Sequence, residues 1–544
     1  MGGFNMRGMR RWFVCVCMLP VITLVQGCSA NNESDHATER NVEPLDRVQI
    51  SVMTPTHQLS KNLQDIPYLN RIASEAKIHV NWMQKRNGWE EAKSAALTSG
   101  ELPDAFLAGL TDQDIIANKD KFVDLSEYID KYAPNIKRMF EEVPETKRVS
   151  TFPNGKLYSL PGVRPINTDS YNVLMINKKW LDKLGLTEPT TLDELREVLK
   201  AFRNGDPNGN GKQDELGMDW WAGAGGNLGS RGLFSVTSLL GAYGVTDNFT
   251  EEMIGVTKGQ IRFLFESDEY KSLVSYLAEL WKEKLINPDV FTQDYSGMKA
   301  SAQQDDVATV GVTFGWSLTD RVGKWADEYV AIPPLRSSSN VAPLWPMSPS
   351  RVRITTNLFS MTIANPNPVE TIQWIDQFYS EENSIQGYYG SMPDYVTKEH
   401  DGIYTIVPAP DGDQDTQQWT NALVDNGPLY FSQSLENKTI VPPAVTIRKE
   451  LDSIYKAYKP KPEDIYPMIK FSSEELNEMA LAKLDIFKLV DEKFAEWIMN
   501  STVDKEWDQY VNQLNQMGLP VLYRIYQQGY EDYYAQPNLN VNNN

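Results

Sequence analysis

The chain has 544 residues, a formal net charge of −21 and only three cysteines. A surface this acidic repels a phosphate backbone, which excludes nucleic acid as a partner. The chain is also long enough to bury one or more large hydrophobic cores, so it does not need disulfides simply to fold.

The first 27 residues have the layout of a secretion signal. Arg7, Arg10 and Arg11 precede an apolar run from Trp12 to Val25. A membrane-spanning helix needs about 20 apolar residues, so this shorter run predicts a signal peptide, residues 1–27, that is removed after export. The alternative is an uncleaved membrane anchor. Removal takes away three arginines and no acidic residue, which changes the net charge from −21 to −24.

The signal ends in V-Q-G-C at Cys28, which resembles a bacterial lipobox, although glutamine is less usual than a small residue at its position. The resemblance implies cleavage before Cys28 and lipid on its sulfur. Cys15 and Cys17 leave with the signal, so no disulfide forms within the mature chain. Residues 28–46 are polar and predict a flexible tether. We therefore expect a lipid-anchored protein on the extracellular face of a bacterial cell membrane.

The globular part begins near Arg47 and alternates strands with helices. Val48–Met53, Ile78–Met83 and Ala105–Leu107 are apolar or β-branched and predict strands. Alanine and leucine recur at helical spacing between the last two of these strands. Strands that alternate with helices in this way are typical of an α/β fold.

Later segments continue this pattern. Thr190 and Thr191, with Glu194 in the first turn, predict a capped helix that ends where Asp206 begins a polar loop. From Ser473 the chain is mostly amphipathic helix, and the tail, residues 536–544, is predicted to be disordered. Further strands are predicted at Asn172–Ile176, Val310–Phe314 and Tyr329–Ile332.

A series of motifs runs along the whole mature chain: LPDAF, NGKLYSLPG, VLMINKKWLDKLGL, DPNGNGKQDELG, KEKLINPDVFTQD, WDQYVNQLNQMGL and IYQQGYEDYY. Their number, order and spacing resemble the family 1 extracellular solute-binding proteins of ABC importers, especially lipoproteins related to the alginate-oligosaccharide binders. The resemblance implies an α/β fold of the two-lobe periplasmic-binding-protein type (type II), with a ligand cleft between the lobes, a helical C-terminal part and no catalysis. It also implies an oligosaccharide ligand, a partner permease with its ATPase, and a monomer.

The same resemblance predicts how the chain is divided. It implies crossings between the lobes near Gly162–Pro165, Ala342–Arg351 and Leu429–Leu435. The first lobe is then formed by residues 47–163 and 352–430. The second lobe, which includes the polar loop and the C-terminal helices, is formed by residues 164–351 and 431–535.

The polar loop is DPNGNGKQDE. Asp206, Asn208 and Asn210 occupy positions one, three and five of an EF-hand loop, and Gly211 supplies the turn at position six. Position twelve is Gly217, where an EF-hand has a bidentate glutamate, and no second helix follows. A paired EF-hand sensor is therefore excluded.

In the solute-binding family, a site of this spacing uses the two following acids directly. The resemblance implies a structural calcium ion that fixes the preceding helix end and the following loop, and three carboxylates with two amides suit such a hard cation. The alternatives are a hydrophilic turn and a phosphate-binding loop, which acidic side chains disfavour. The expected calcium ligands are Asp206, Asn208, Asn210, the carbonyl of Lys212, Asp214 and Glu215.

Several aromatic residues lie beside glycine or proline in predicted loops, where sugar-binding side chains are commonly placed. Sugar rings have apolar faces that stack on aromatic planes. Arginines near the predicted crossings offer a partner for an acidic sugar. The alternatives are core aromatics and surface salt bridges. The expected ligand-binding residues are Trp220, Trp221, Trp316, Trp345, Tyr389, Arg164 and Arg351.

The sequence does not favour an enzyme. His36, His57, His79 and His400 lie far apart, no G-x-S-x-G occurs, and no thiol remains for nucleophilic work. A surface glycoside hydrolase needs only two carboxylates and stays open as the alternative. The favoured function is capture of an oligosaccharide by hinge closure and its delivery to a permease.

Overall fold

The computed structural model describes residues 47–165, 168–170, 172–222, 234–247, 250, 252–303, 306–410 and 414–535. The predicted signal, tether and C-terminal tail lie outside this set. A compact unit begins at Arg47. Within the described residues, no helix is both long and apolar enough to cross a membrane.

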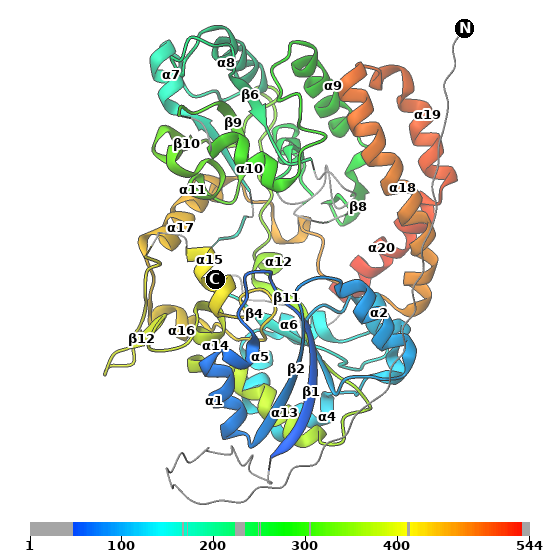
Figure 1. Ribbon diagram of the computed structural model, residues 1–544. Helices are drawn as coiled ribbons and strands as arrows, with labels where there is room; N and C mark the ends of the chain where they lie inside the picture. The colour runs from blue at the N-terminus through cyan, green and yellow to red at the C-terminus, as the bar shows by residue number, and fades with distance from the viewer. Residues whose placement is uncertain are drawn as a thin grey trace, which may run out of the picture. The chain divides into compact units, whose positions relative to one another are not determined.

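The first sheet is mixed, with the strand order β2-β1-β3-β11-β4. Strand β1 is parallel to β2 and β3, whereas β11 is antiparallel to β3 and β4. The three predicted N-terminal strands are confirmed, and helices α1 and α2 supply the crossovers that parallel neighbours require (Figure 1). The bounds are β1 Val48–Pro55, β2 Ile78–Lys85, β3 Ala105–Leu107, β4 Leu160–Val163 and β11 Ile354–Met361.

Helices cover this sheet, and four of them, α1, α4, α5 and α13, share one hydrophobic core with it. Val52, Leu107 and Phe359 come from three strands and pack with Ile72 of α1 and Trp374 of α13. All five side chains are fully buried, so each contributes its apolar area to stability. The helices are α1 Pro67–Glu75, α2 Trp89–Ser99, α3 Asp112–Ala117, α4 Ser126–Tyr132, α5 Pro134–Glu142, α6 Pro144–Ser150, α13 Pro368–Asp376 and α14 Glu381–Tyr389.

The second sheet has the order β10-β5-β9-β6, with β6 parallel to β9 and β5 antiparallel to both of its neighbours. Every residue of β5 is buried, as expected of a strand covered on both faces. The predicted cap of α8 is confirmed, because Thr191 Oγ1 accepts from the Glu194 amide. The bounds are β5 Val173–Asn177, β6 Leu216–Asp219, β9 Val310–Gly315, β10 Tyr329–Ala331, α7 Lys178–Leu184 and α8 Leu192–Asn204.

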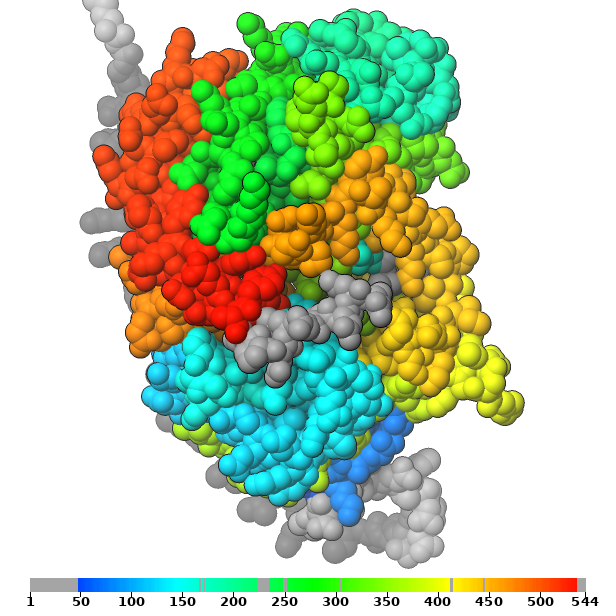
Figure 2. All heavy atoms as spheres, turned by 180° about the vertical axis from the view of Figure 1, so that it is seen from behind, coloured from blue at the N-terminus to red at the C-terminus, as the bar shows by residue number. Residues whose placement is uncertain are grey.

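The C-terminal helices pack against the second sheet's side of the molecule, through α9 (Asp268–Lys282). Figure 2 shows these red helices against the green segment that contains α9. Phe494, Trp497 and Tyr510 are buried in the same core as the second sheet. The predicted C-terminal helical part is therefore confirmed, as α18 Ser473–Asn500, α19 Val503–Gln516 and α20 Leu519–Ala535.

One residue just before α18 connects these helices to the first sheet. Lys470 is buried, and its Nζ donates to Asn357 Oδ1 of β11 at 3.0 Å and to the carboxylate of Asp112 at the start of α3. Burial lowers the pKa of Lys470, and the Asp112 carboxylate opposes that shift. Separating the two residues would leave a buried charge unpaired, so this contact is costly to break.

Smaller elements complete the described chain. A three-stranded sheet has the order β12-β13-β14, and β7 and β8 form a hairpin. The bounds are β7 Ile254–Thr257, β8 Gln260–Phe263, β12 Val396–Lys398, β13 Tyr404–Ile406, β14 Thr439–Ile440, α10 Tyr295–Gln303, α11 Leu318–Val322, α12 Pro349–Arg353, α15 Gln414–Asn421, α16 Gln433–Asn437 and α17 Pro443–Tyr455.

Two of the predicted crossings, Gly162–Pro165 and Leu429–Leu435, contribute segments that lie side by side, and a third segment begins at Arg353, just after the predicted crossing Ala342–Arg351. The Val163 amide donates to Leu429 O and Val163 O accepts from the Phe431 amide, both at 2.8 Å. The Arg164 amide donates to Arg353 O, also at 2.8 Å. We call these paired segments the crossing strip: residues 160–164, 353–355 and 429–431. The lobe boundaries themselves stay a prediction.

Gly162 permits the close packing of this strip. A Cβ there would lie 2.6 Å from Leu358 Cδ1 and 3.2 Å from the carbonyl oxygen of Leu429. We expect Gly162→Ala to lower the free energy of unfolding by about 1–3 kcal/mol, because the added methyl overlaps the buried Leu358 side chain and also presses on the hydrogen-bonded backbone of Leu429. Urea unfolding measures this change.

Gly387→Ala is the matched control. Gly387 lies within α14, and its added Cβ would be 3.6 Å from Tyr68 Oη, an ordinary contact. Alanine is a better helix former than glycine by about 1 kcal/mol, so this variant should be neutral or more stable. Equal unfolding midpoints for the two variants would contradict the role of Gly162.

Candidate functional site

The predicted calcium loop joins the end of α8 to β6. Asp206 adopts a left-handed backbone conformation with φ of 43°. Its carboxylate accepts from the amides of Gly209 at 3.0 Å and Gly211 at 3.2 Å, so the loop folds back around this side chain. Lys183 Nζ donates to the carbonyl of Asp206, not to its carboxylate.

Two asparagine amides gather around Asp214. The Nδ2 groups of Asn208 and Asn210 donate to its two carboxylate oxygens at 2.9 and 2.8 Å. The side-chain oxygen of Asn208 accepts from the Asn210 amide, and that of Asn210 accepts from the Lys212 amide. These local hydrogen bonds turn the loop tightly and draw together the oxygen-bearing side chains.

Glu215 is the residue of the loop whose side chain lacks hydrogen-bond partners. Its side chain is buried, and neither carboxylate oxygen has a hydrogen-bond partner of normal geometry. Burial raises the pKa of Glu215, and the charges of Asp214 and Asp206 raise it further, while the amides of Glu215 and Asn208 oppose the shift. A buried carboxylate without a partner is costly unless a cation compensates it.

The carboxylates alone do not make a metal site in this conformation. Across the described ranges, no group of three or more His, Cys, Asp or Glu side chains is placed to hold a metal ion. Binding of a cation at the loop would therefore also draw on the oxygens of Asn208 and Asn210 and on the carbonyl of Lys212, as hard cations with six to eight ligands do.

Three of the predicted ligand-binding aromatics lie in the packed interior. Trp220, Trp345 and Tyr389 are each no more than 1% exposed. The Trp345 ring stacks on Tyr455 at 4.7 Å between centroids, and its Nε1 donates to Asn172 O. In this conformation none of the three offers a ring face to a ligand, so the core interpretation fits them better.

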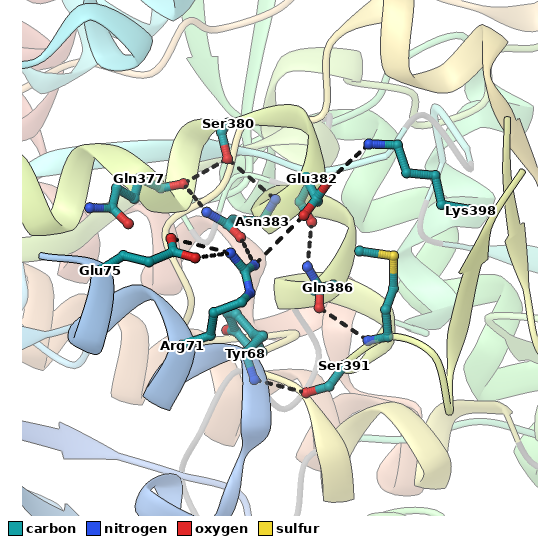
Figure 3. Close-up of polar contacts among 11 residues, drawn as sticks. Tyr68, Arg71, Glu75, Gln377, Ser380, Glu382, Asn383, Gln386, Ser391 and Lys398 are labelled. Carbon is teal, nitrogen blue, oxygen red and sulfur yellow. Dashed lines mark hydrogen bonds and ion pairs between the residues drawn. The ribbon is translucent and has the colours of Figure 1, made fainter. Parts of the chain in front are cut away.

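The helix that carries Tyr389 is fixed to the first sheet's side of the molecule. Figure 3 shows Arg71 of α1 between Glu75 of its own helix and Asn383 of α14. Arg71 Nη2 donates to Asn383 Oδ1 at 2.5 Å, and the Tyr68 amide donates to Ser391 Oγ at 3.2 Å. These contacts make α14 a structural support.

The remaining two aromatics, Trp221 and Trp316, are half-buried. They follow β6 and β9, which are parallel neighbours, so both lie at the carboxyl edge of the second sheet. The guanidinium of Arg448 lies 4.8 Å from the Trp316 ring centroid. Ligands of open α/β sheets bind outside this edge, so both residues are well placed for a ligand.

A buried network holds that edge in position. Arg321 Nη2 donates to Asp219 Oδ2 at 2.6 Å, and its Nε donates to Thr313 Oγ1 at 2.8 Å. The other oxygen of Asp219 accepts from Asn287 and Gln293. Since Asp219 ends β6, this network fixes the turn that carries Trp221.

The predicted arginines have partners within the chain. Arg164 Nη2 lies 3.7 Å from Asp425 Oδ1 and donates to the Asp425 carbonyl at 3.3 Å. Arg351 Nη2 donates to the carbonyls of Tyr466 and Pro467 at 3.2 Å each. Arg164 is at the rim of the crossing strip, whereas Arg351 helps to fix the segment before α18.

The structure also brings together two residues that the sequence analysis did not select. His57 follows β1 and is exposed, and its ring stacks on that of Trp419 in α15, with 4.8 Å between centroids and 18° between planes. Strand β1 is parallel to β3, so this stack lies at the carboxyl edge of the first sheet. No local signal predicts the pairing, because it depends on a contact between distant segments.

Comparison with known proteins agrees with this arrangement. Residues 61–385 match the protein family described as bacterial extracellular solute-binding protein. The fructooligosaccharide ABC transporter substrate-binding protein FusA of Streptococcus pneumoniae serotype 4 (strain ATCC BAA-334 / TIGR4) is 29% identical, over 96% of this chain and 98% of FusA.

Solved structures have the same fold. An HMO-binding, ABC-transporter-associated solute-binding protein from Bifidobacterium longum infantis ATCC 15697 has a TM-score of 0.82 at 26% identity, covering 90% of this chain and 99% of that one. A FusA EF-hand mutant in complex with fructo-nystose has a TM-score of 0.80 at 27% identity, with the same coverage. The alginate-binding protein AlgQ2 shares the fold, with a TM-score of 0.65 at 21% identity, again over 90% and 99%.

The match to the family spans more than half of the chain, and the relatives align over nearly their whole length. The mixed α/β fold and the helical C-terminal part correspond to those solved structures. This chain therefore belongs to the family of bacterial extracellular solute-binding proteins.

Proposed function

We propose that the protein is the oligosaccharide-binding component of an ABC importer, which captures its ligand outside the cell and delivers it to a membrane permease with an ATPase. The observation that carries this proposal is the near-full-length match to FusA, a fructooligosaccharide ABC transporter substrate-binding protein by name. The likeness to an HMO-binding solute-binding protein supports the same class of ligand.

The geometry suits capture by hinge closure. Trp221 and Trp316 lie at the carboxyl edge of the second sheet, and at the crossing strip the chain leaves the first sheet after β4 and returns to it at β11. Hinges are commonly a few residues at the ends of elements, as in this strip. A ligand that contacts both sides favours the closed state by its difference in affinity for the two states. Such a protein binds sugar without turning it over.

We expect purified protein to bind at least one oligosaccharide from a panel of fructo-, malto-, xylo- and galactooligosaccharides. Isothermal titration calorimetry measures affinity, and small-angle scattering should show a smaller radius of gyration with the bound sugar, because closure brings the two sides together. The reducing-end content should stay constant during incubation.

Two outcomes would contradict this proposal. Release of new reducing ends would favour the glycoside hydrolase alternative. Absence of binding across the panel would remove the oligosaccharide assignment. A mixture of free amino acids serves as the control for nonspecific heat.

We also propose that the Asp206–Glu215 loop binds calcium as a structural ion. The support is the orphaned carboxylate of Glu215 in a loop with two other carboxylates. Lys183 donates to the backbone carbonyl of Asp206, so this bond leaves the Asp206 carboxylate available to a cation. A bound cation would neutralise these charges and fix the loop between α8 and β6, with Asp206, Asn208, Asn210, the Lys212 carbonyl, Asp214 and Glu215 as ligands.

Calcium should raise the melting temperature of the wild-type protein relative to chelator, by an amount equivalent to about 2.7 kcal/mol at a hundredfold excess over Kd. We expect Glu215→Gln to abolish this shift but to raise the melting temperature in chelator, because it removes a buried, unpartnered charge. Differential scanning calorimetry distinguishes the two effects.

The pH dependence has a defined sign. The pKa of Glu215 is raised in the folded state. In chelator, the stability that Glu215 contributes to the folded protein is therefore fully present below the ordinary pKa near 4.5, and it is lost as pH rises through the raised pKa. Calcium should reverse that loss. Glu188→Gln is the control, because Glu188 is an exposed acid between α7 and α8. It should change neither the calcium-induced shift of the melting temperature nor the pH dependence of stability. A calcium shift that survives Glu215→Gln would contradict the site.

We retain the proposal that Cys28 carries lipid, supported by the V-Q-G-C sequence after the arginine-led apolar run. Cys28→Ala should move the protein from the membrane fraction to the medium or periplasm, because its one lipid attachment site is lost. Cys17→Ala, which changes a cysteine of the signal itself, is the control and should leave the protein on the membrane. A Cys28→Ala protein that stays membrane-bound after signal cleavage would refute the anchor.

A further inference from the structure

The carboxyl edge of the first sheet carries an aromatic surface open to solvent. His57 is exposed, Trp419 is half-buried, and their rings stack at 4.8 Å. Leu59, two residues after His57, is 50% exposed. Large apolar groups gathered at an exposed edge commonly mark a binding surface, and this edge is where ligands of α/β sheets bind.

The stack is held by its neighbours, so it is in place before a ligand arrives. Ser60 Oγ donates to Trp419 O at 2.9 Å, and the Lys61 amide donates to Thr420 O at 3.0 Å. Arg86 Nη2 donates to Ser60 O at 2.7 Å. These bonds join the segment after β1 to α15, and preorganisation of this kind lowers the entropy cost of binding.

Polar groups lie beside the stack. Trp419 Nε1 donates to Asp425 Oδ2 at 3.1 Å, and Arg164 Nη2 lies 3.7 Å from Asp425 Oδ1. The side chains of Asp425 and Arg164 are 53% and 28% exposed, so both retain contact with solvent. An acceptor carboxylate and a donor guanidinium next to an aromatic plane match a sugar, which has hydroxyls around an apolar ring face.

The Asp425–Arg164 pair favours one class of sugar. The guanidinium of Arg164 is compensated by Asp425, so it does not present a net positive charge to an incoming carboxylate. The Asp425 carboxylate would also repel a uronate bound beside it. A neutral ring needs no charge partner and can accept from Arg164 and donate to Asp425 at the same time.

Resting on the function proposed above, we propose that His57 and Trp419, with Asp425 and Arg164, form a subsite that binds a neutral sugar ring of the oligosaccharide. The aromatic pair holds the apolar face of the ring, and the Asp425–Arg164 pair binds its hydroxyls. This subsite contacts the ligand from the first sheet, whereas Trp221 and Trp316 contact it from the second.

Calorimetric titration tests the subsite with matched neutral and acidic probes, the panel of neutral oligosaccharides named above and trigalacturonate. The wild type should bind a neutral probe more tightly than trigalacturonate. Trp419→Ala should weaken the neutral probe about tenfold to a hundredfold, because a stacking face is lost. Trp419→Phe should recover part of this loss, and His57→Ala should weaken binding to a smaller extent.

Two controls separate the subsite from general damage. His79→Ala changes an exposed histidine of β2, and Trp82→Phe changes a tryptophan of the same strand that packs on Trp374. Both should leave affinity unchanged, and melting temperatures should show that every variant is folded.

Asp425→Asn tests the charge argument directly. It frees the charge of Arg164, so trigalacturonate should gain affinity several-fold relative to the neutral probe. Neutral binding that is unchanged by Trp419→Ala would overturn the subsite alone. Tighter binding of trigalacturonate by the wild type would overturn its neutral selectivity. Failure of every neutral probe to bind the wild type would overturn both the subsite and the proposed function.

Discussion

Backbone hydrogen bonds in the crossing strip fix β4 and β11, the strands by which the chain leaves the first sheet for the second and returns from it, and the rest of the structure depends on them. Val163 is bonded to Leu429 and Phe431, and Arg164 is bonded to Arg353. The bonded segments are far apart in sequence but form a narrow ribbon of extended chain. A ribbon only a few residues long can bend with small changes of φ and ψ, whereas a wide packed interface cannot. The strip thus fixes where the chain passes between the two sheets, and its short length suits it to act as a hinge.

The buried contact of Lys470 adds a second connection and restricts that rotation. Lys470 comes just before α18, which packs on α9, yet its Nζ bonds to Asp112 and Asn357 beside the first sheet. Breaking this contact would leave a charge without a partner in the interior. A rotation preserves only contacts near its axis. A closure that preserves this contact turns about a line that passes close to Lys470.

The sequence predicted the fold well because its signals are local. The apolar run of β5, the Thr191 cap and the helical pattern after Ser473 each depend on residues within a few positions. The division into two α/β lobes came from the family resemblance. The pairing of the strands into two mixed sheets was not predicted, since local patterns do not specify which distant strands meet.

The candidate site was predicted less completely, because burial depends on distant partners. Trp345 lies beside proline, as a loop aromatic would, but Tyr455 from α17 covers its ring. Trp419 lies in a polar helix with no glycine or proline beside it, and only the folded chain places it on His57. The Asp206–Glu215 loop was predicted as a calcium site from its spacing and the family resemblance, whereas the orphaned state of the Glu215 carboxylate is visible only in the structure.

Arginine–aspartate pairs occur at both carboxyl edges. Arg164, Arg321 and Arg448 lie at or behind the edges, and each has an aspartate within reach: Asp425 at 3.7 Å, Asp219 at 2.6 Å and Asp452 at 3.4 Å. These arginines therefore provide hydrogen bonds and planar surfaces without an uncompensated positive charge. The protein as a whole is strongly acidic, so an anionic ligand would meet repulsion at long range. A neutral ligand does not meet this repulsion. The net charge and the arginine–aspartate pairs therefore support the proposed preference for a neutral sugar, whose ring the aromatic faces at the two edges would stack against.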